Sequence, residues 1–221
     1  FSNFYLLLCT KPICAEYNIN DSNLDGDIMN LPSNENWDYV GVSKFHEALS
    51  YLEKYIEMHG NIANLVIVSH ASKNEIALGG SISVDVLNSI HSGEGYVDSN
   101  SKNNVKALSW IAENTKGWIC FLGCKAGTSG LPEAIRNHLN ATTNGEYNLF
   151  FNTHSTVRNS SPWDNSKRAI PWNTPLSVTG ERKLIIAPNP QWLLVRRSGI
   201  TPINVDLSLS NSGTPINFVN K

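Results

Sequence analysis

One histidine and one cysteine each follow directly on an apolar run, and such a pair can do chemistry. The runs are "NLVIVSH", which ends in His70, and "WICFLGC", which ends in Cys124. A thiol with a pKa near about 8.5 becomes a strong nucleophile when a neighbouring imidazole or a helix N-terminus favours the thiolate. We therefore interpret Cys124 as a nucleophile and His70 as its general base or thiolate partner. The alternative interpretation of Cys124 is a buried, inert thiol, in which case His70 has no catalytic role.

The elements around these two residues alternate between strands and helices. Buried apolar runs and amphipathic spacing predict a strand at 4–9, a helix at 43–60, a strand at 64–70, a helix at 105–117, a strand at 118–123, a helix at 131–140 and a strand at 147–157. This alternation is typical of a mostly parallel central sheet flanked by helices. Reactive groups gather beyond the carboxyl ends of such strands, so we expect His70 and Cys124 side by side.

The chain of 221 residues has room for one α/β domain with a small appendage. The pattern changes near residue 160 to loops rich in proline and tryptophan, with short apolar runs that suggest hairpins or edge strands. We predict an α/β catalytic core over 1–160 and a β- and loop-rich C-terminal extension over 161–221, packed on that core. The net charge of −2 offers no field that would attract nucleic acid or an anionic membrane.

The four cysteines are too few for a disulfide scaffold at this length. Cys9 and Cys14 are close enough in sequence to pair locally, whereas Cys120 is expected to be a core thiol. The first apolar run is too short to span a bilayer, and with "PICAEYN" it is similar to the end of a signal peptide, although a buried strand is the simpler interpretation. The compartment stays open, with an exported bacterial protein slightly favoured.

Taken together, "LVIVSHAS" and "ICFLGCKAG" resemble the double signature of the caspase-like (clan CD) cysteine peptidases, and in particular bacterial members. The resemblance covers roughly residues 4–157 and implies a caspase-like fold. It implies cleavage of a protein or peptide substrate, or of the chain itself, by a His70/Cys124 dyad that needs no cofactor. The backbone N–H groups of Ala71 and Cys124 would form the oxyanion hole.

Ala71 departs from the family pattern, which has glycine at this place. Alanine would be strained there if the turn requires a positive φ, and the oxyanion hole would then be displaced. The resemblance also implies a specificity pocket near the strand after the cysteine. Its candidate residues in this sequence are Thr153, Ser155 and Asp164.

A separate motif, "DSNLDGDI", matches the first half of a calcium loop. Its oxygen ligands would be Asp21, Asn23 and Asp25. Pro32 occupies the place of the bidentate glutamate, so a complete EF-hand is excluded, and Glu35 or Asp38 would have to close a looser Ca²⁺ site. A polar surface loop is the simpler interpretation of the motif.

Two other functions are compatible with the sequence. One is a catalytically inactive caspase-like binding or regulatory module, whose C-terminal tryptophans would supply a partner surface: Trp163, Trp172 and Trp192. The other is a thiol hydrolase that pairs Cys124 with His154, because related amidases place the cysteine first and the histidine later on a strand.

The remaining candidates have simpler structural explanations. A zinc site built from Cys120, Cys124 and His138 lacks a paired CxxC motif and is disfavoured. A hydrolase elbow would need glycines where the chain has Leu122 and Ala126. The other histidines, on predicted helices or loops, are expected at the surface or at helix ends: His46, His59, His91 and His138. The sequence makes no prediction of the oligomeric state.

Overall fold

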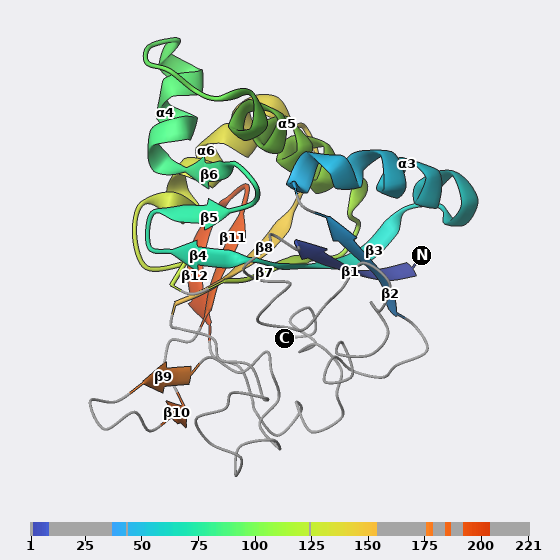
Figure 1. Cartoon of the computed structure of the whole chain (residues 1–221). Helices are drawn as coiled ribbons and strands as arrows, with labels where there is room; N and C mark the ends of the chain where they lie inside the picture. Colours follow the sequence, from blue (N-terminus) through green and yellow to red (C-terminus); the bar gives the residue numbers. More distant parts are fainter. Residues whose placement is uncertain are drawn as a thin grey trace.

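The computed structural model describes residues 2–8, 37–42, 44–123, 125–153, 176–178, 184–186 and 192–203. A seven-stranded sheet with the order β12-β11-β8-β7-β3-β1-β2 runs through its centre (Figure 1). The strands are β1 (Ser2–Leu8), β2 (Trp37–Val42), β3 (Ile62–Val68), β7 (Ile119–Leu122), β8 (Asn148–Asn152), β11 (Trp192–Arg196) and β12 (Gly199–Ile203).

The five strands from β2 to β8 pair in parallel, and β11 and β12 add antiparallel to β8. This arrangement confirms the predicted α/β fold with a mostly parallel sheet. The strand order reverses at β1, because the chain goes from β1 to β2 on one side and returns to β3 on the other. In open α/β sheets ligands and reacting groups gather at the carboxyl edge of the strands, which is the edge where β3 and β7 end.

In the part of the chain that the structure describes, four helices lie on one face of the sheet (Figure 1): α3 (Ala48–His59), α4 (Val84–Ser92), α5 (Ser99–Asn114) and α6 (Leu131–Thr142), with a short 3-10 turn η2 (Phe45–Glu47) before α3. The spacing of apolar residues explains which side of each helix is buried. In α3, for example, Ala48, Leu52 and Tyr55 form one buried stripe. Gly60, with φ 85°, ends α3 in a conformation that a side chain would resist.

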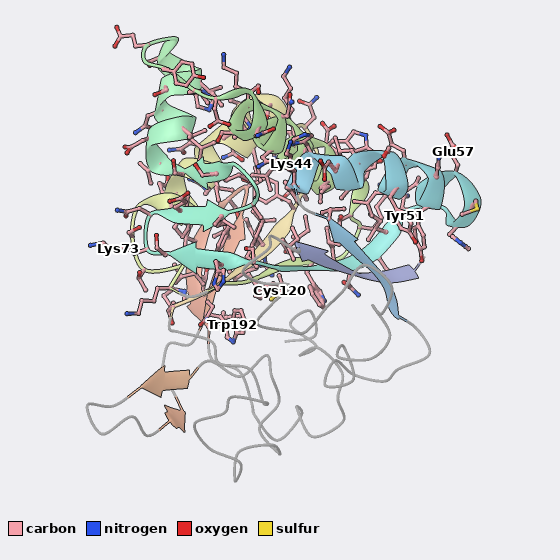
Figure 2. The ribbon with its side chains drawn as sticks, in the orientation of Figure 1. Lys44, Tyr51, Glu57, Lys73, Cys120 and Trp192 are labelled. Atoms are coloured by element: carbon pink, nitrogen blue, oxygen red, sulfur yellow. The ribbon has the colours of Figure 1, made fainter. Side chains whose placement is uncertain are left out.

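Side chains are buried on both faces of the sheet. Phe121 of β7 and Phe151 of β8 face the helices and stack with ring centroids 4.8 Å apart. Alternation along each strand directs Cys120, Phe150 and Trp192 to the other face. Figure 2 shows Cys120 and Trp192 on the side of the sheet away from the helices.

Several elements of the structure have no counterpart in the predicted strands and helices. A second, three-stranded sheet with the order β4-β5-β6 follows β3 and leads into α4. Its strands are β4 (His70–Ser72), β5 (Glu75–Ala77) and β6 (Ser81–Ser83). They are too short to show a period. β2 is also new, because no strand was predicted between the strand expected at 4–9 and the helix expected at 43–60. The strand expected at 64–70 therefore ends at Val68, and His70 opens the second sheet.

Helix α5 begins well before the residue 105 that the apolar pattern indicates. Asp98 caps it, because its carboxylate accepts hydrogen bonds from the Ser101 amide (2.9 Å) and hydroxyl (2.6 Å). Asn104 is fully buried and donates to the Leu78 carbonyl (3.2 Å). Polar contacts hold the first turns of this helix, so apolar periodicity could not find them.

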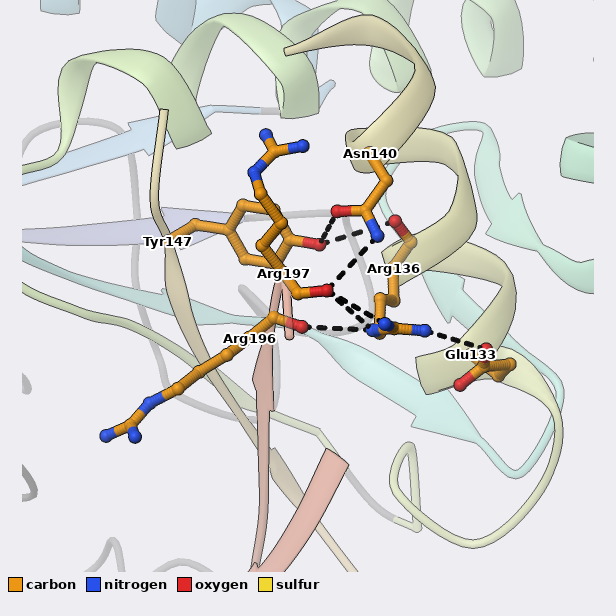
Figure 3. Close-up of polar contacts among 6 residues, drawn as sticks. All are labelled: Glu133, Arg136, Asn140, Tyr147, Arg196 and Arg197. Atoms are coloured by element: carbon orange, nitrogen blue, oxygen red, sulfur yellow. Dashed lines mark hydrogen bonds and ion pairs between the residues drawn. The ribbon is translucent and has the colours of Figure 1, made fainter. Parts of the chain in front are cut away.

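Arginines bind the hairpin of β11 and β12 to the rest of the domain (Figure 3). Arg136 of α6 donates from Nε to the Arg196 carbonyl (3.1 Å) and from Nη2 to the Arg197 carbonyl (2.8 Å). Arg197 in turn donates to the Thr143 carbonyl (2.9 Å), and its guanidinium lies 5.5 Å from the centroid of the Tyr147 ring. The expected C-terminal extension thus contributes two strands to the main sheet.

A further antiparallel pair joins β9 (Leu176–Val178) to β10 (Leu184–Ile186). No helix in the described ranges has the length and apolar character to cross a membrane.

Candidate functional site

The two strands that lead to His70 and Cys124 are neighbours. β3 and β7 pair in parallel, and their last paired residues are Val68 and Leu122. Ser69 and Gly123 come next in the chain, so the described segments directly before His70 and Cys124 end at the same edge of the sheet. Cys124 itself lies outside the described residues.

A close contact joins the segments next to these two positions. A Cβ on Gly123 would lie 2.5 Å from the Cβ of Ala71 and 3.2 Å from the carbonyl oxygen of Ser69. Real Cβ atoms essentially never approach so closely. Only glycine fits at position 123, and the backbone just before Cys124 therefore packs directly on the turn that carries His70.

His70 is exposed and pairs with Ala77 at the open end of the hairpin between β4 and β5. Ala71 pairs with Ile76 of β5. The strain expected if Ala71 had to adopt a positive φ does not occur, because Lys125 is the one non-glycine residue with positive φ in the described part of the chain. Alanine is compatible with this position because Ala71 lies in the extended strand β4.

The described loop that begins at Lys125 starts with this positive φ. Lys125 has φ 57°, and its carbonyl oxygen accepts hydrogen bonds from the Thr128 amide (3.1 Å) and hydroxyl (2.8 Å). The Gly127 amide donates to the Asn152 carbonyl at the end of β8 (2.9 Å). A left-handed non-glycine residue costs roughly 1–2 kcal/mol and persists only where surrounding contacts enforce it. No pattern in the sequence predicts the positive φ of Lys125.

Cys120 fits its expected role as a core thiol. It is buried within β7, and burial raises the pKa of the thiol far above its ordinary value. A thiol that stays protonated is inert as a nucleophile. The described residues contain no cluster of three or more His, Cys, Asp or Glu side chains that could hold a metal ion.

Two predictions about exposed side chains are wrong. Trp192 is fully buried in β11, so it is not part of a partner surface. His138 is 4% exposed rather than a surface or cap residue. Its burial is tolerated because its ring nitrogens lie 3.0 Å from the Ser109 hydroxyl and 3.1 Å from His91.

Of the three predicted pocket residues, Thr153 is half-buried and directly follows β8, the neighbour of β7. Thr153 thus lies at the same carboxyl edge of the sheet as Ser69 and Gly123. The other predicted site residues lie outside the described residues: Ser155 and Asp164 of the pocket, His154 of the alternative dyad, Asp21, Asn23 and Asp25 of the calcium loop, and Trp163 and Trp172 of the partner surface.

Comparison of the chain with protein-family models, with curated proteins and with solved structures gives no match. The geometry of the site therefore carries the functional argument alone.

Proposed function

We propose that this chain is a cysteine peptidase of the caspase-like kind, in which His70 and Cys124 form the dyad. The observation that carries the proposal is the contact between Gly123 and Ala71. It joins the residue before Cys124 to the residue after His70, at the carboxyl edge of two adjacent parallel strands. In open α/β sheets this edge is where reacting groups gather.

In the proposed reaction the Cys124 thiolate attacks the carbonyl carbon of a peptide bond. A C–S bond forms, the C–N bond breaks, and His70 gives its proton to the leaving amine. Water then hydrolyses the thioester, releases the acid product and restores the thiol. The exposed position of His70 gives its ring access to both the leaving amine and the incoming water.

The oxyanion of the tetrahedral intermediate would accept hydrogen bonds from the backbone N–H groups of Ala71 and Cys124. The Ala71 nitrogen lies 3.5 Å from the position of a Cβ on Gly123, so this donor stands beside the residue that precedes Cys124. The left-handed Lys125 supports the same interpretation, because backbone strain is characteristic of sites that present a reactive side chain.

The substrate would be a protein or peptide, or a segment of this chain. Thr153 is the pocket candidate whose place at the sheet edge agrees with such a role. The inactive module loses two of its arguments, because Ala71 has no positive φ and Trp192 is buried.

Thiol labelling tests the proposal. The protein is treated with iodoacetamide at pH 7, and mass spectrometry follows alkylation of the Cys124 peptide over time. We expect Cys124 to label rapidly and His70→Ala to slow labelling, with peptidase activity falling by about 10²-fold or more, the contribution typical of a general base. His59→Ala, which removes an exposed histidine of α3, is the matched control.

Equal labelling and activity in His70→Ala and in the control would refute the dyad. A loss in His154→Ala instead would assign the thiol hydrolase, and a Cys124 that does not label at all would favour the inactive module.

A further inference from the structure

We propose that His91 and His138 form a binding site for a divalent transition-metal ion, with Zn²⁺ as the fitting class, between the last turn of α4 and the middle of α6. The Nδ1 atom of His138 lies 3.1 Å from the Nε2 atom of His91. Two imidazoles on a tetrahedral Zn²⁺, with Zn–N bonds of about 2.0–2.1 Å, hold their nitrogens about 3.3 Å apart. The pair is therefore close to ligand spacing before any ion arrives.

The hydrogen bonds around His138 fix which of its ring nitrogens carries the proton and which carries the lone pair. The Thr142 hydroxyl donates to the His138 carbonyl (2.8 Å), so its oxygen can only accept from the Ser109 hydroxyl (2.9 Å). The Ser109 hydroxyl already donates its one proton to Thr142, so its oxygen must accept from Nε2–H of His138 (3.0 Å). Nδ1 of His138 therefore carries the lone pair and accepts a hydrogen bond from Nε2–H of His91 (3.1 Å). An ion between the two rings would replace that proton, and the His91 ring would then carry its proton on Nδ1.

This arrangement matches the support that metal-binding histidines usually have. A ligand histidine almost always donates its other ring N–H to an oxygen, which fixes the tautomer and the ring orientation. Ser109 provides that oxygen here from the neighbouring helix α5. The network thus positions one ligand rigidly and without a metal.

The surroundings leave one side of the histidine pair open to an ion. His138 is 4% exposed, and the hydroxyl network described above holds its ring in place. His91 is exposed and lies in the last turn of α4, where the helix dipole stabilises positive charge. Solvent waters can reach the exposed side and complete the coordination.

The bound ion would connect α4 to α6, and it would bind the folded chain in preference to the unfolded one. Zn²⁺ at a hundredfold excess over its Kd should then raise the midpoint of thermal unfolding by about 5–10 °C for a chain of this size. The site is separate from the proposed dyad, and the inference does not rest on the proposed function.

The test is calorimetric titration with Zn²⁺ at pH 7, together with thermal unfolding in Zn²⁺ and in EDTA. All variants carry Cys124→Ser, so that the proposed nucleophile does not contribute a ligand. We expect one site that is lost in His91→Ala, an exposed position where the fold should persist. Ser109→Ala should weaken binding by about tenfold, because it removes the oxygen that orients His138. His59→Ala is the control and should bind as the parent does.

The proposal fails if the parent shows no saturable binding, or if His91→Ala binds Zn²⁺ as tightly as the parent. A loss of binding in His59→Ala with retention in His91→Ala would also overturn it, because the ion would then sit on α3.

Discussion

The contact between Gly123 and Ala71 can be tested by placing a methyl group in it and then removing its neighbour. In Gly123→Ala the new Cβ would lie 2.5 Å from that of Ala71, roughly 1 Å inside ordinary contact. Neither atom can turn away, because both are attached directly to the backbone of a strand or its end. Such overpacking typically costs about 1–3 kcal/mol in the free energy of unfolding, and we expect the upper half of that range.

Ala71→Gly removes the colliding methyl group. Alone it should cost about 0.5–1 kcal/mol, because glycine loses more backbone freedom in a strand than alanine does. In the double variant the nearest remaining atoms are the Ser69 carbonyl oxygen at 3.2 Å and the Ala71 nitrogen at 3.5 Å, which demand only small shifts. The double variant should therefore be more stable than Gly123→Ala alone, with a coupling energy of about 1–2 kcal/mol.

Urea unfolding followed by tryptophan fluorescence measures the four free energies, and labelling of Cys124 reports on the site in the same proteins. Gly145→Ala is the matched control, since a Cβ there has open space around it. Additive effects of the two substitutions would refute the juxtaposition of β7 with the turn after His70. The argument for the dyad would then lose its main support.

Three further predictions concern other contacts. Arg136→Ala should lower the free energy of unfolding, measured in urea, by about 1–3 kcal/mol, because it removes charged donors to the hairpin carbonyls. The control Glu133→Ala breaks only a surface ion pair and should change the free energy of unfolding by less than about 0.5 kcal/mol. Equal effects of the two substitutions would contradict the role given to Arg136. Lys125→Gly should raise stability by about 0.5–1 kcal/mol by relieving the positive φ, whereas Lys125→Ala should change it little; a loss in the glycine variant would be the contrary result. His138 has a pKa lowered to about 4 in the folded chain, so the unfolded chain binds the proton more readily, and in EDTA stability should fall as the pH drops from about 6.5 to 4. The loss should be about 1–3 kcal/mol, as measured by urea midpoints across that range, and a flat profile would show that the ring is not desolvated.

The catalytic interpretation could be proposed from the sequence because its signal is local. Two apolar runs, each ending in a reactive residue, predict buried strands that open on one edge, and the observed pairing of Val68 with Leu122 puts their ends level. The short β4–β6 sheet and the first turns of α5 could not be predicted in this way. They depend on hydrogen bonds such as that from Asn104 to Leu78, which join residues far apart in the chain.

The sequence by itself determined the α/β class and the order of the main strands and helices, and it led to the proposal of a histidine–cysteine pair, because hydrophobic periodicity and strand-end position are properties of neighbouring residues. Only the tertiary structure decided that Gly123 packs on Ala71, that Trp192 is enclosed, and that His138 meets His91 inside the helical layer. Each of these depends on which elements become neighbours in space. Burial and contact are properties of the packed chain, and the same residue types at the same spacing can be exposed or enclosed depending on what lies beside them.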